Sequence, residues 1–143
     1  MTHQEAKLIF ERTLRDAAKT GKPLFGIDLT FDNVDYEPTV GKTYIQTHSL
    51  PVDTFTSTLD GRDHTGLKGI FQMKIVGSSG TSNGEAAAIA TKLRALFRTD
   101  TLFTSGEDWV QVTTPLVVNE GRSQDGNWSV PTHFEYRSDT SNY

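Results

Sequence analysis

The pattern of hydrophobic positions predicts an amphipathic helix near the start of the chain. Thr2 and Glu5 have the spacing of a capping box, in which the hydroxyl accepts a hydrogen bond from an N-terminal amide. Gly21 can form the C-terminal cap, and Pro23 stops continuation of the helix. Positions three or four residues apart form the buried stripe: Ala6, Ile9, Phe10, Thr13, Leu14 and Ala17. The opposite face carries charged side chains: Lys7, Glu11, Arg12 and Arg15.

A second amphipathic helix follows a glycine-rich segment in the middle of the chain. Ser82 and Glu85 repeat the capping-box spacing. Its basic residues, Lys92, Arg94 and Arg98, favour the C-terminal half, where cations complement the helix dipole. The buried stripe again has helical spacing: Ala86, Ile89, Ala90, Leu93, Leu96 and Phe97.

Two longer segments alternate with the period of a β-strand. In residues 67–76 one face holds Leu67, Phe71, Met73 and Ile75, and the other holds Lys68, Gln72 and Lys74. In residues 127–136 one face holds Trp128, Val130, Thr132, Phe134 and Tyr136. Pro131 cannot donate to a ladder, so it predicts an edge strand or a bulge. Shorter strands are expected at residues 24–27, 43–50, 109–112 and 116–119.

This order of elements predicts one α+β domain over residues 1–136, with a polar tail at residues 137–143. Strands segregated from two helices favour an antiparallel or mixed sheet with both helices on one face. The 143 residues suit a single domain with a sizeable core. Twenty threonines fit strands that have one wet face.

Charge and composition exclude several classes of function. The net charge of −4 argues against a general nucleic-acid-binding protein, which needs a basic footprint on phosphate. The absence of cysteine excludes disulfides, thiolate metal sites and cysteine nucleophiles. The N-terminus lacks the pattern of a signal peptide, and no apolar stretch is long enough to cross a bilayer. We therefore expect folding in a cytoplasm, without a membrane partner.

Residues 77–84, Gly-Ser-Ser-Gly-Thr-Ser-Asn-Gly, link a predicted strand to a predicted helix. Such a loop can hold phosphate with backbone amides. The lysine of a phosphate-binding loop and the Gly-x-Gly-x-x-Gly pattern are both absent. A crossover that ends in a helix cap is the favoured interpretation, and a small ligand-binding domain is a remote alternative.

Two acidic segments raise the question of metal or acid–base chemistry. Asp28, Asp32, Asp35 and Glu37 match no EF-hand spacing, so a solvated edge or pairing with a basic partner is favoured over a cation site. The second group lies in turn-like sequence around Asp-Gly: Asp60, Arg62, Asp63 and His64. The four histidines lack ligand spacing, and no nucleophile motif appears. We predict no catalytic residue, metal or cofactor.

The connection between the strands ending at Leu50 and beginning at Leu67 is unusually long. Residues 51–66 are sixteen residues, whereas hairpin loops usually have about two to five. We interpret this segment as a threonine-rich hairpin arm that contacts another subunit or protein, the alternative being a mobile surface loop. Its candidate contact residues are Asp53, Phe55, Thr58, Asp60, Arg62, Asp63 and His64.

Several of these segments together resemble the tail terminator proteins of long-tailed bacteriophages. The resemblance comprises Tyr44–Pro51 (YIQTHSLP), a variable threonine-rich segment, Leu67–Val76 (LKGIFQMKIV), the glycine-rich crossover and the alanine-rich helix ending Leu96-Phe97. It extends over about residues 1–136, because the first helix and the late strands match in order.

The resemblance implies a structural virion protein and supplies no catalytic residue. Members form a six-membered ring on the head-proximal end of the tail tube, end its growth and meet the neck proteins. DNA would pass through the lumen without specific binding. Another head–tail connector or a tail tube protein is the alternative.

Three surfaces are candidate interfaces on this basis. The arm would reach the tube or a neighbour. The polar strand face with Lys68, Gln72 and Lys74 would face the lumen or an adjacent subunit, or simply solvent. The acidic segment with Asp32, Asp35 and Glu37 would meet Arg12 and Arg15 on the basic first helix of a neighbour, since opposite potentials fix register.

Overall fold

The described residues form two helices and eight strands. The computed structural model describes residues 2–31, 43–59, 62–78, 83–105, 108–124 and 127–141. The helices are α1 (His3–Ala17) and α2 (Asn83–Leu96). The strands are β1 (Asp28–Thr30), β2 (Tyr44–Leu59), β3 (Arg62–Ser78), β4 (Leu102–Ser105), β5 (Asp108–Val112), β6 (Val117–Val118), β7 (Arg122–Gln124) and β8 (Asn127–Ser141).

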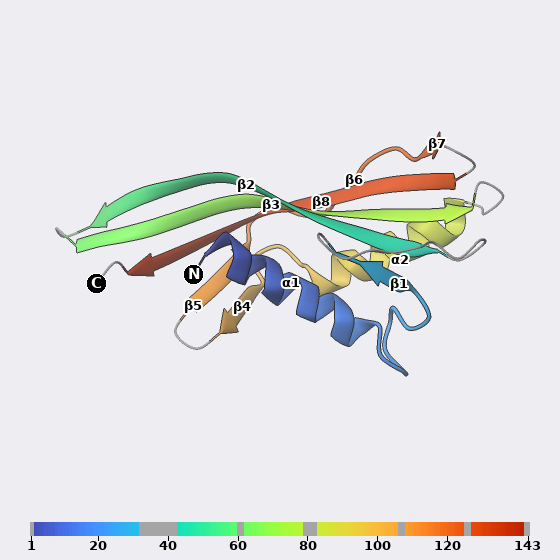
Figure 1. The fold of residues 1–143 in the computed structure, drawn as a ribbon, viewed down its shortest axis with the longest axis horizontal. Coiled ribbons are helices and arrows are strands. Elements are labelled where there is room, and N and C mark those ends of the chain that lie inside the picture. The colour runs from blue at the N-terminus through green and yellow to red at the C-terminus, as the bar shows by residue number, and fades with distance from the viewer. Residues whose placement is uncertain are drawn as a thin grey trace.

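All eight strands belong to one mixed sheet. Its order is β1-β2-β3-β8-β5-β4, and β6 and β7 pair in turn with β8. The β1–β2 pair is parallel and the other pairs are antiparallel. The three longest strands, β2, β3 and β8, extend along the molecule side by side (Figure 1). The predicted α+β class is therefore confirmed.

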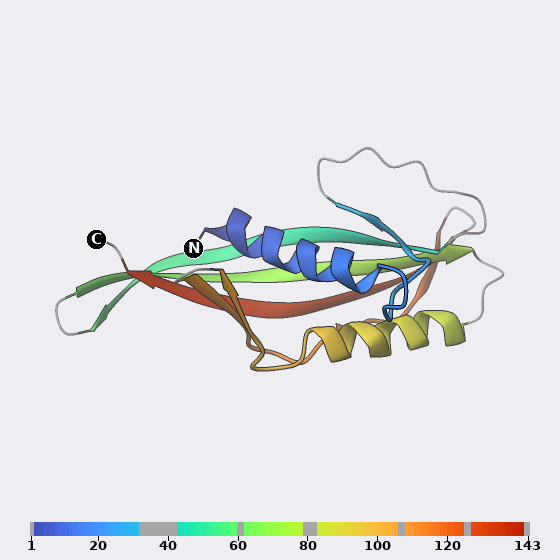
Figure 2. The same ribbon diagram turned by 90° about the horizontal axis from the view of Figure 1, so that it is seen from below.

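Both helices lie on the same face of this sheet, as the two perpendicular views show (Figures 1 and 2). The predicted stripes face the sheet: Phe10 and Leu14 of α1 and Leu93 of α2 are fully buried. The alternating residues of β3 and β8 supply the other side of the core, including Phe71, Met73, Phe134 and Tyr136. Neither described helix lies on the opposite face of the three long strands, so the described core is on one side of the sheet.

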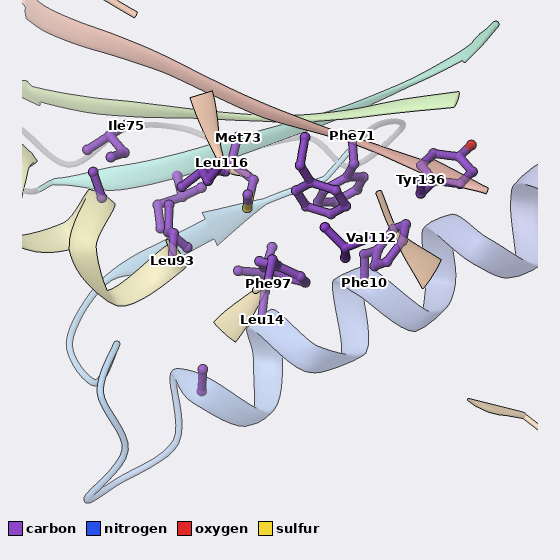
Figure 3. Close-up of a cluster of buried hydrophobic side chains, with 14 of the residues drawn as sticks. Phe10, Leu14, Phe71, Met73, Ile75, Leu93, Phe97, Val112, Leu116 and Tyr136 are labelled. Carbon is purple, nitrogen blue, oxygen red and sulfur yellow. The ribbon is translucent and has the colours of Figure 1, made fainter. Parts of the chain in front are cut away.

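An aromatic cluster centred on Phe10 fills the middle of the core (Figure 3). The Phe10 ring lies 5.1 Å from the Phe71 ring and 5.1 Å from the Phe134 ring, measured between centroids. Phe97, Phe103 and Tyr136 also approach Phe10 within 6 Å. Edge-to-face ring pairs of this kind stabilise a core beyond the area that they bury.

The first helix begins as its sequence predicts and differs in two details. The Thr2 hydroxyl accepts a hydrogen bond of 3.1 Å from the Glu5 amide, as expected of an N-cap. Glu11, expected on the wet face, is 4% exposed because it lies at the margin of the stripe, three residues before Leu14. Gly21 has a φ of +80° but lies in the turn after the helix, which is capped at Ala18.

Several strand boundaries differ from the sequence-based expectation. Residues 24–27 form turns, with Leu24 buried against the core, and the strand begins only at Asp28. β4 and β7 were not expected, because segments of three or four residues are too short to show a period. Residues 137–141, expected as a polar tail, form the end of β8 and pair with β3 as far as Ser141.

Pro131 lies inside the sheet, not at its edge. β8 pairs with β3 on one side and with β5, β6 and β7 on the other. The Pro131 carbonyl accepts a hydrogen bond from the Asn119 amide, so its missing N–H points to the side of β6 and β7. Pro131 falls between the residues that pair with these two short strands, which leaves the β3 ladder complete.

A β-bulge at Val52 changes the phase of β2. Pro51 pairs with Gly69, but Asp53 pairs with Lys68, so Val52 is an extra residue on its strand. Before the bulge, Ile45 and Thr47 share the helix-covered face. After it, the register places Thr54, Thr56 and Thr58 on the same face as Leu67. An extra residue thus exchanges the two faces of the strand.

Candidate assembly surfaces

The segment between Pro51 and Gly66 is not a loop but the outer part of two paired strands. β2 continues to Leu59 and β3 begins at Arg62. The end of β8 joins them as a third strand, with Thr65 opposite both Thr56 and Thr140. We call this three-stranded region, Asp53–Leu59, Arg62–Lys68 and Arg137–Ser141, the arm. It extends beyond the helices at the end of the molecule where the C-terminus lies (Figure 2).

The register divides the predicted arm residues between the two faces. Asp53 is paired with Lys68 and Phe55 with Gly66, on the face that carries no helix; Arg62 and His64 hold positions on the same face. Thr58 and Asp63 pair with each other on the opposite face. Asp60 lies outside the described residues. The arm brings these positions together, although the sequence separates them by up to eleven residues.

A buried tyrosine marks the root of the arm. Tyr136 of β8 is 1% exposed and lies opposite Gly69 of β3. A Cβ atom at Gly69 would overlap the Tyr136 hydroxyl oxygen, so only glycine leaves room for the ring. Strand pairs of this kind let an aromatic ring cover a glycine.

The Tyr136 hydroxyl is tied to the first helix. Its oxygen lies 2.9 Å from Nδ1 of His3, and the two rings meet edge to face at 6.1 Å. Burial raises the pKa of Tyr136, and a hydrogen bond with Ser49 of β2 partly offsets that rise. One side chain therefore joins α1, β2, β3 and β8 where the arm leaves the core.

A pocket of about 340 Å³ adjoins the same place. Val52, the bulge residue, lines it together with Lys68, Glu135 and Arg137. Val52 is 62% exposed. The surface at the base of the arm thus has an exposed apolar side chain beside positively and negatively charged ones. This mixture is typical of a protein contact surface rather than a catalytic cleft.

The helix-free sheet face is polar, as its alternation predicts. Lys68 and Gln72 are exposed and Lys74 is partly exposed, all opposite the core residues of β3. Gln72 lies between His48 of β2 and His133 of β8 in the strand register. An open groove of about 760 Å³ lies farther along this face and is lined by Lys74, Glu120 and Arg122 among others.

One of the two predicted basic residues of α1 contacts Phe31 of the same chain. Arg12 and Arg15 are exposed. The Arg15 guanidinium carbon lies 4.7 Å from the centre of the Phe31 ring, a cation–π arrangement. The predicted acidic residues that follow, Asp32, Asp35 and Glu37, lie outside the described residues.

The remaining candidate sites offer no sign of chemistry in the described part of the chain. Residues 79–82 of the glycine-rich segment, which include the predicted cap Ser82, lie outside it. Glu85 in the first turn of α2 accepts a hydrogen bond of 2.7 Å from the Thr43 hydroxyl. No group of three potential metal ligands occurs among the described residues. No described helix is long and apolar enough to cross a membrane.

The arm root was missed from the sequence. His3, Gly69 and Tyr136 are far apart in the chain, and neither His3 nor Gly69 belongs to a periodic pattern. The available signal was a glycine inside an otherwise alternating strand, because such a glycine often marks close approach of another group.

The fold defines the chain as a single α+β domain whose sheet extends past its core as an arm. A model of the phage tail terminator protein family matches residues 9–136. The chain therefore belongs to the phage tail terminator family, and it is a structural protein of the bacteriophage tail. Membership implies contact with other tail and neck proteins.

A solved structure shares the fold of this chain. One solved protein chain is 26% identical to this chain, with a TM-score of 0.75 over 96% of each chain. No curated protein matches the chain. The resemblance drawn from residues 1–136 is thus confirmed by a match over nearly the same range.

Proposed function

We propose that six copies of this protein form a ring on the head-proximal end of the tail tube. The ring ends polymerisation of the tube and presents a surface to the neck or head-completion proteins. In this role the protein acts by binding alone, with no catalytic residue and no cofactor. Its place is the virion tail, after assembly in the host cytoplasm.

The arm is the observation that carries this proposal. Its strands would span about 23 Å if Asp53–Leu59 is fully extended. The described helices do not extend over its outer part (Figure 2), although Leu67 and Ser138 at its base are buried. Its residues are mainly threonine, serine and aspartate. A two- or three-stranded ribbon with so little apolar surface is marginal alone. Contact with a tube subunit or with a neighbouring copy buries the surface of the arm and so stabilises it.

The helix-free face is suited to the lumen or to an adjacent subunit. Around its pocket and groove there are four basic side chains, Lys68, Lys74, Arg122 and Arg137, and two acidic ones, Glu120 and Glu135. Such mixed charge lacks the dense basic footprint of tight phosphate binding. DNA can therefore pass this face without specific binding.

The first helix offers the second contact between copies. Arg12 and Arg15 would meet the acidic segment with Asp32, Asp35 and Glu37 of the neighbour. Arg15 contacts the ring of Phe31 in its own chain, and Phe31 directly precedes the acidic segment in the sequence. Complementary charge here would set the register of the ring more than its affinity.

Electron microscopy of the purified protein, with and without tube protein, tests the proposal. We expect single rings of six subunits, at least when tube is present, and tubes whose length stops increasing once the protein is added. Long tubes formed by the protein itself would indicate a tube protein. Co-purification with portal-side proteins but not with tube would indicate another connector. A monomer that binds neither would overturn the proposal.

A further inference from the structure

Several strand edges have no partner among the described strands, and two of them lie on opposite sides of the sheet. At one end of the strand order, β1 pairs only with Tyr44–Gln46, so the part of β2 in the arm has β3 on one side alone. At the other end, β4 pairs with β5 alone. We call Thr54–Thr58 of β2 the arm edge and Leu102–Ser105 the β4 edge.

Both edges lack the charged residues and prolines that usually protect an edge strand. Natural edges carry lysine, proline or a bulge that prevents pairing with another chain. The arm edge reads Thr-Phe-Thr-Ser-Thr and the β4 edge reads Leu-Phe-Thr-Ser, so neither holds a charge or a proline. Pro51 and the bulge at Val52 lie at the base of the arm and protect only that end.

The strand that carries the β4 edge also packs on the surface of the core. Phe103 packs against Phe10 and Phe97 at ring distances of 5.7 Å and 5.9 Å, which anchors the strand. Leu102 beside it is 57% exposed. A strand that is packed on the core, with an open backbone edge and an exposed leucine, is a suitable template for strand addition.

We propose that the arm edge of one copy pairs with the β4 edge of the next copy, so that the sheet continues from subunit to subunit. This inference depends on the proposed ring and identifies the strands that meet between neighbouring subunits. The two edges differ and lie at opposite ends of the strand order, so the contact is heterologous. A heterologous contact closes into a ring when the rotation between copies allows it. Every copy carries one arm edge and one β4 edge, so each arm edge in a ring has a β4 edge with which to pair. A different partner would not provide this match.

Disulfide trapping tests which edges meet, and the absence of cysteine from the chain keeps the background clean. Each arm-edge residue is changed to cysteine in turn, in a protein that also carries Thr104→Cys. We expect oxidation of assembled rings to give covalent multimers up to six subunits for one or two arm positions, since a disulfide needs Cα atoms about 4.4–6.8 Å apart. Thr104→Cys alone and Lys92→Cys with Ser57→Cys are the controls and should give no such series.

Hydrogen exchange resolved to single residues separates strand pairing from packing of faces. Every second amide of the arm edge points away from β3, and we expect these amides to exchange at least tenfold more slowly in the ring than in the monomer.

If rings form and neither cross-links nor protection appears, the proposed edge contact is wrong, but the proposed ring is not. Protection that appears only with tube protein would assign the arm edge to the tube and also overturn it. If no rings form under any condition, the proposed function itself fails.

Discussion

The core and the arm are built from the same three strands, yet opposite kinds of residue hold them. In the core, β3 and β8 alternate between large apolar and polar side chains, and the Phe10 cluster closes over them. In the arm, the continuation of the same face holds Thr54, Thr56 and Thr58. In the arm the strands remain hydrogen-bonded to one another, although the described helices no longer cover them.

This contrast shows that strand pairing and burial are separable in this fold. Backbone hydrogen bonds continue the sheet to the end of β8, but the free energy that stabilises a domain comes mainly from apolar burial. The core should therefore determine whether the chain folds, and the arm should determine what the folded chain assembles with. The following predictions test that division in order of decreasing effect on stability.

Phe10→Ala should have the largest effect. It removes a fully buried ring from the centre of the cluster and leaves a cavity, which costs about 3–5 kcal/mol in the free energy of unfolding. Urea unfolding followed by circular dichroism measures it. Leu8→Ala on the same helix is the control, because Leu8 is 45% exposed and should change stability by less than about 0.5 kcal/mol. Equal losses in both variants would contradict the location of the core.

Gly69→Ala should have the next largest effect, because its Cβ would overlap the Tyr136 ring. Overpacking of this kind costs about 1–3 kcal/mol in the free energy of unfolding. The same change made with Tyr136→Leu should cost less, since the overlapping ring atoms are gone. A double-mutant cycle by urea unfolding checks this coupling, and additive costs would rule out the contact.

Tyr136→Phe should cost about 1 kcal/mol at neutral pH, through loss of the hydrogen bonds of a buried hydroxyl. Burial raises the pKa of Tyr136 in the folded state, so the unfolded tyrosine ionises first as pH rises. The wild type therefore loses stability above about pH 10, where unfolded tyrosine ionises, and the Phe variant lacks this loss. Unfolding curves at pH 8 and pH 11 should show the difference shrinking. A difference that stays constant would place the hydroxyl in water.

Phe55→Ala in the arm should have the smallest effect on the monomer. We expect a change of less than about 0.5 kcal/mol in the free energy of unfolding. Assembly into rings should instead weaken at least tenfold, as measured by sedimentation with tube protein. Lys92→Ala, on the exposed side of α2, is the matched control and should assemble normally. A large loss of monomer stability would show that the arm belongs to the core.

Much of the fold was predictable wherever a period continues for ten residues. Both helices, the burial of Phe71 and Phe134, and the wet face with Lys68 and Gln72 follow from spacing alone. The hairpin arm could be inferred only from the length of the connection, because its sequence is similarly polar at alternate positions and alternation gives no signal there. The bulge at Val52 also shifts the phase of β2, which hides the continuity of the strand.

The sequence predicted which residues the candidate surfaces contain, but not which distant segments come together to form them. The contents of the arm were apparent, but the third strand from residues 137–141 depends on pairing between distant segments. The arm root combines His3, Gly69 and Tyr136, which only the three-dimensional fold brings together.

The position of the two chain ends has a practical consequence for anyone who handles this protein. Ser141 lies in the arm opposite His64, and His3 contacts Tyr136 at the arm root, so an affinity tag on either terminus would crowd the assembling region. The turn after α1, where Lys22 and Phe25 are exposed, lies at the far end of that helix (Figure 1). A short epitope inserted there should label the subunit without blocking its arm.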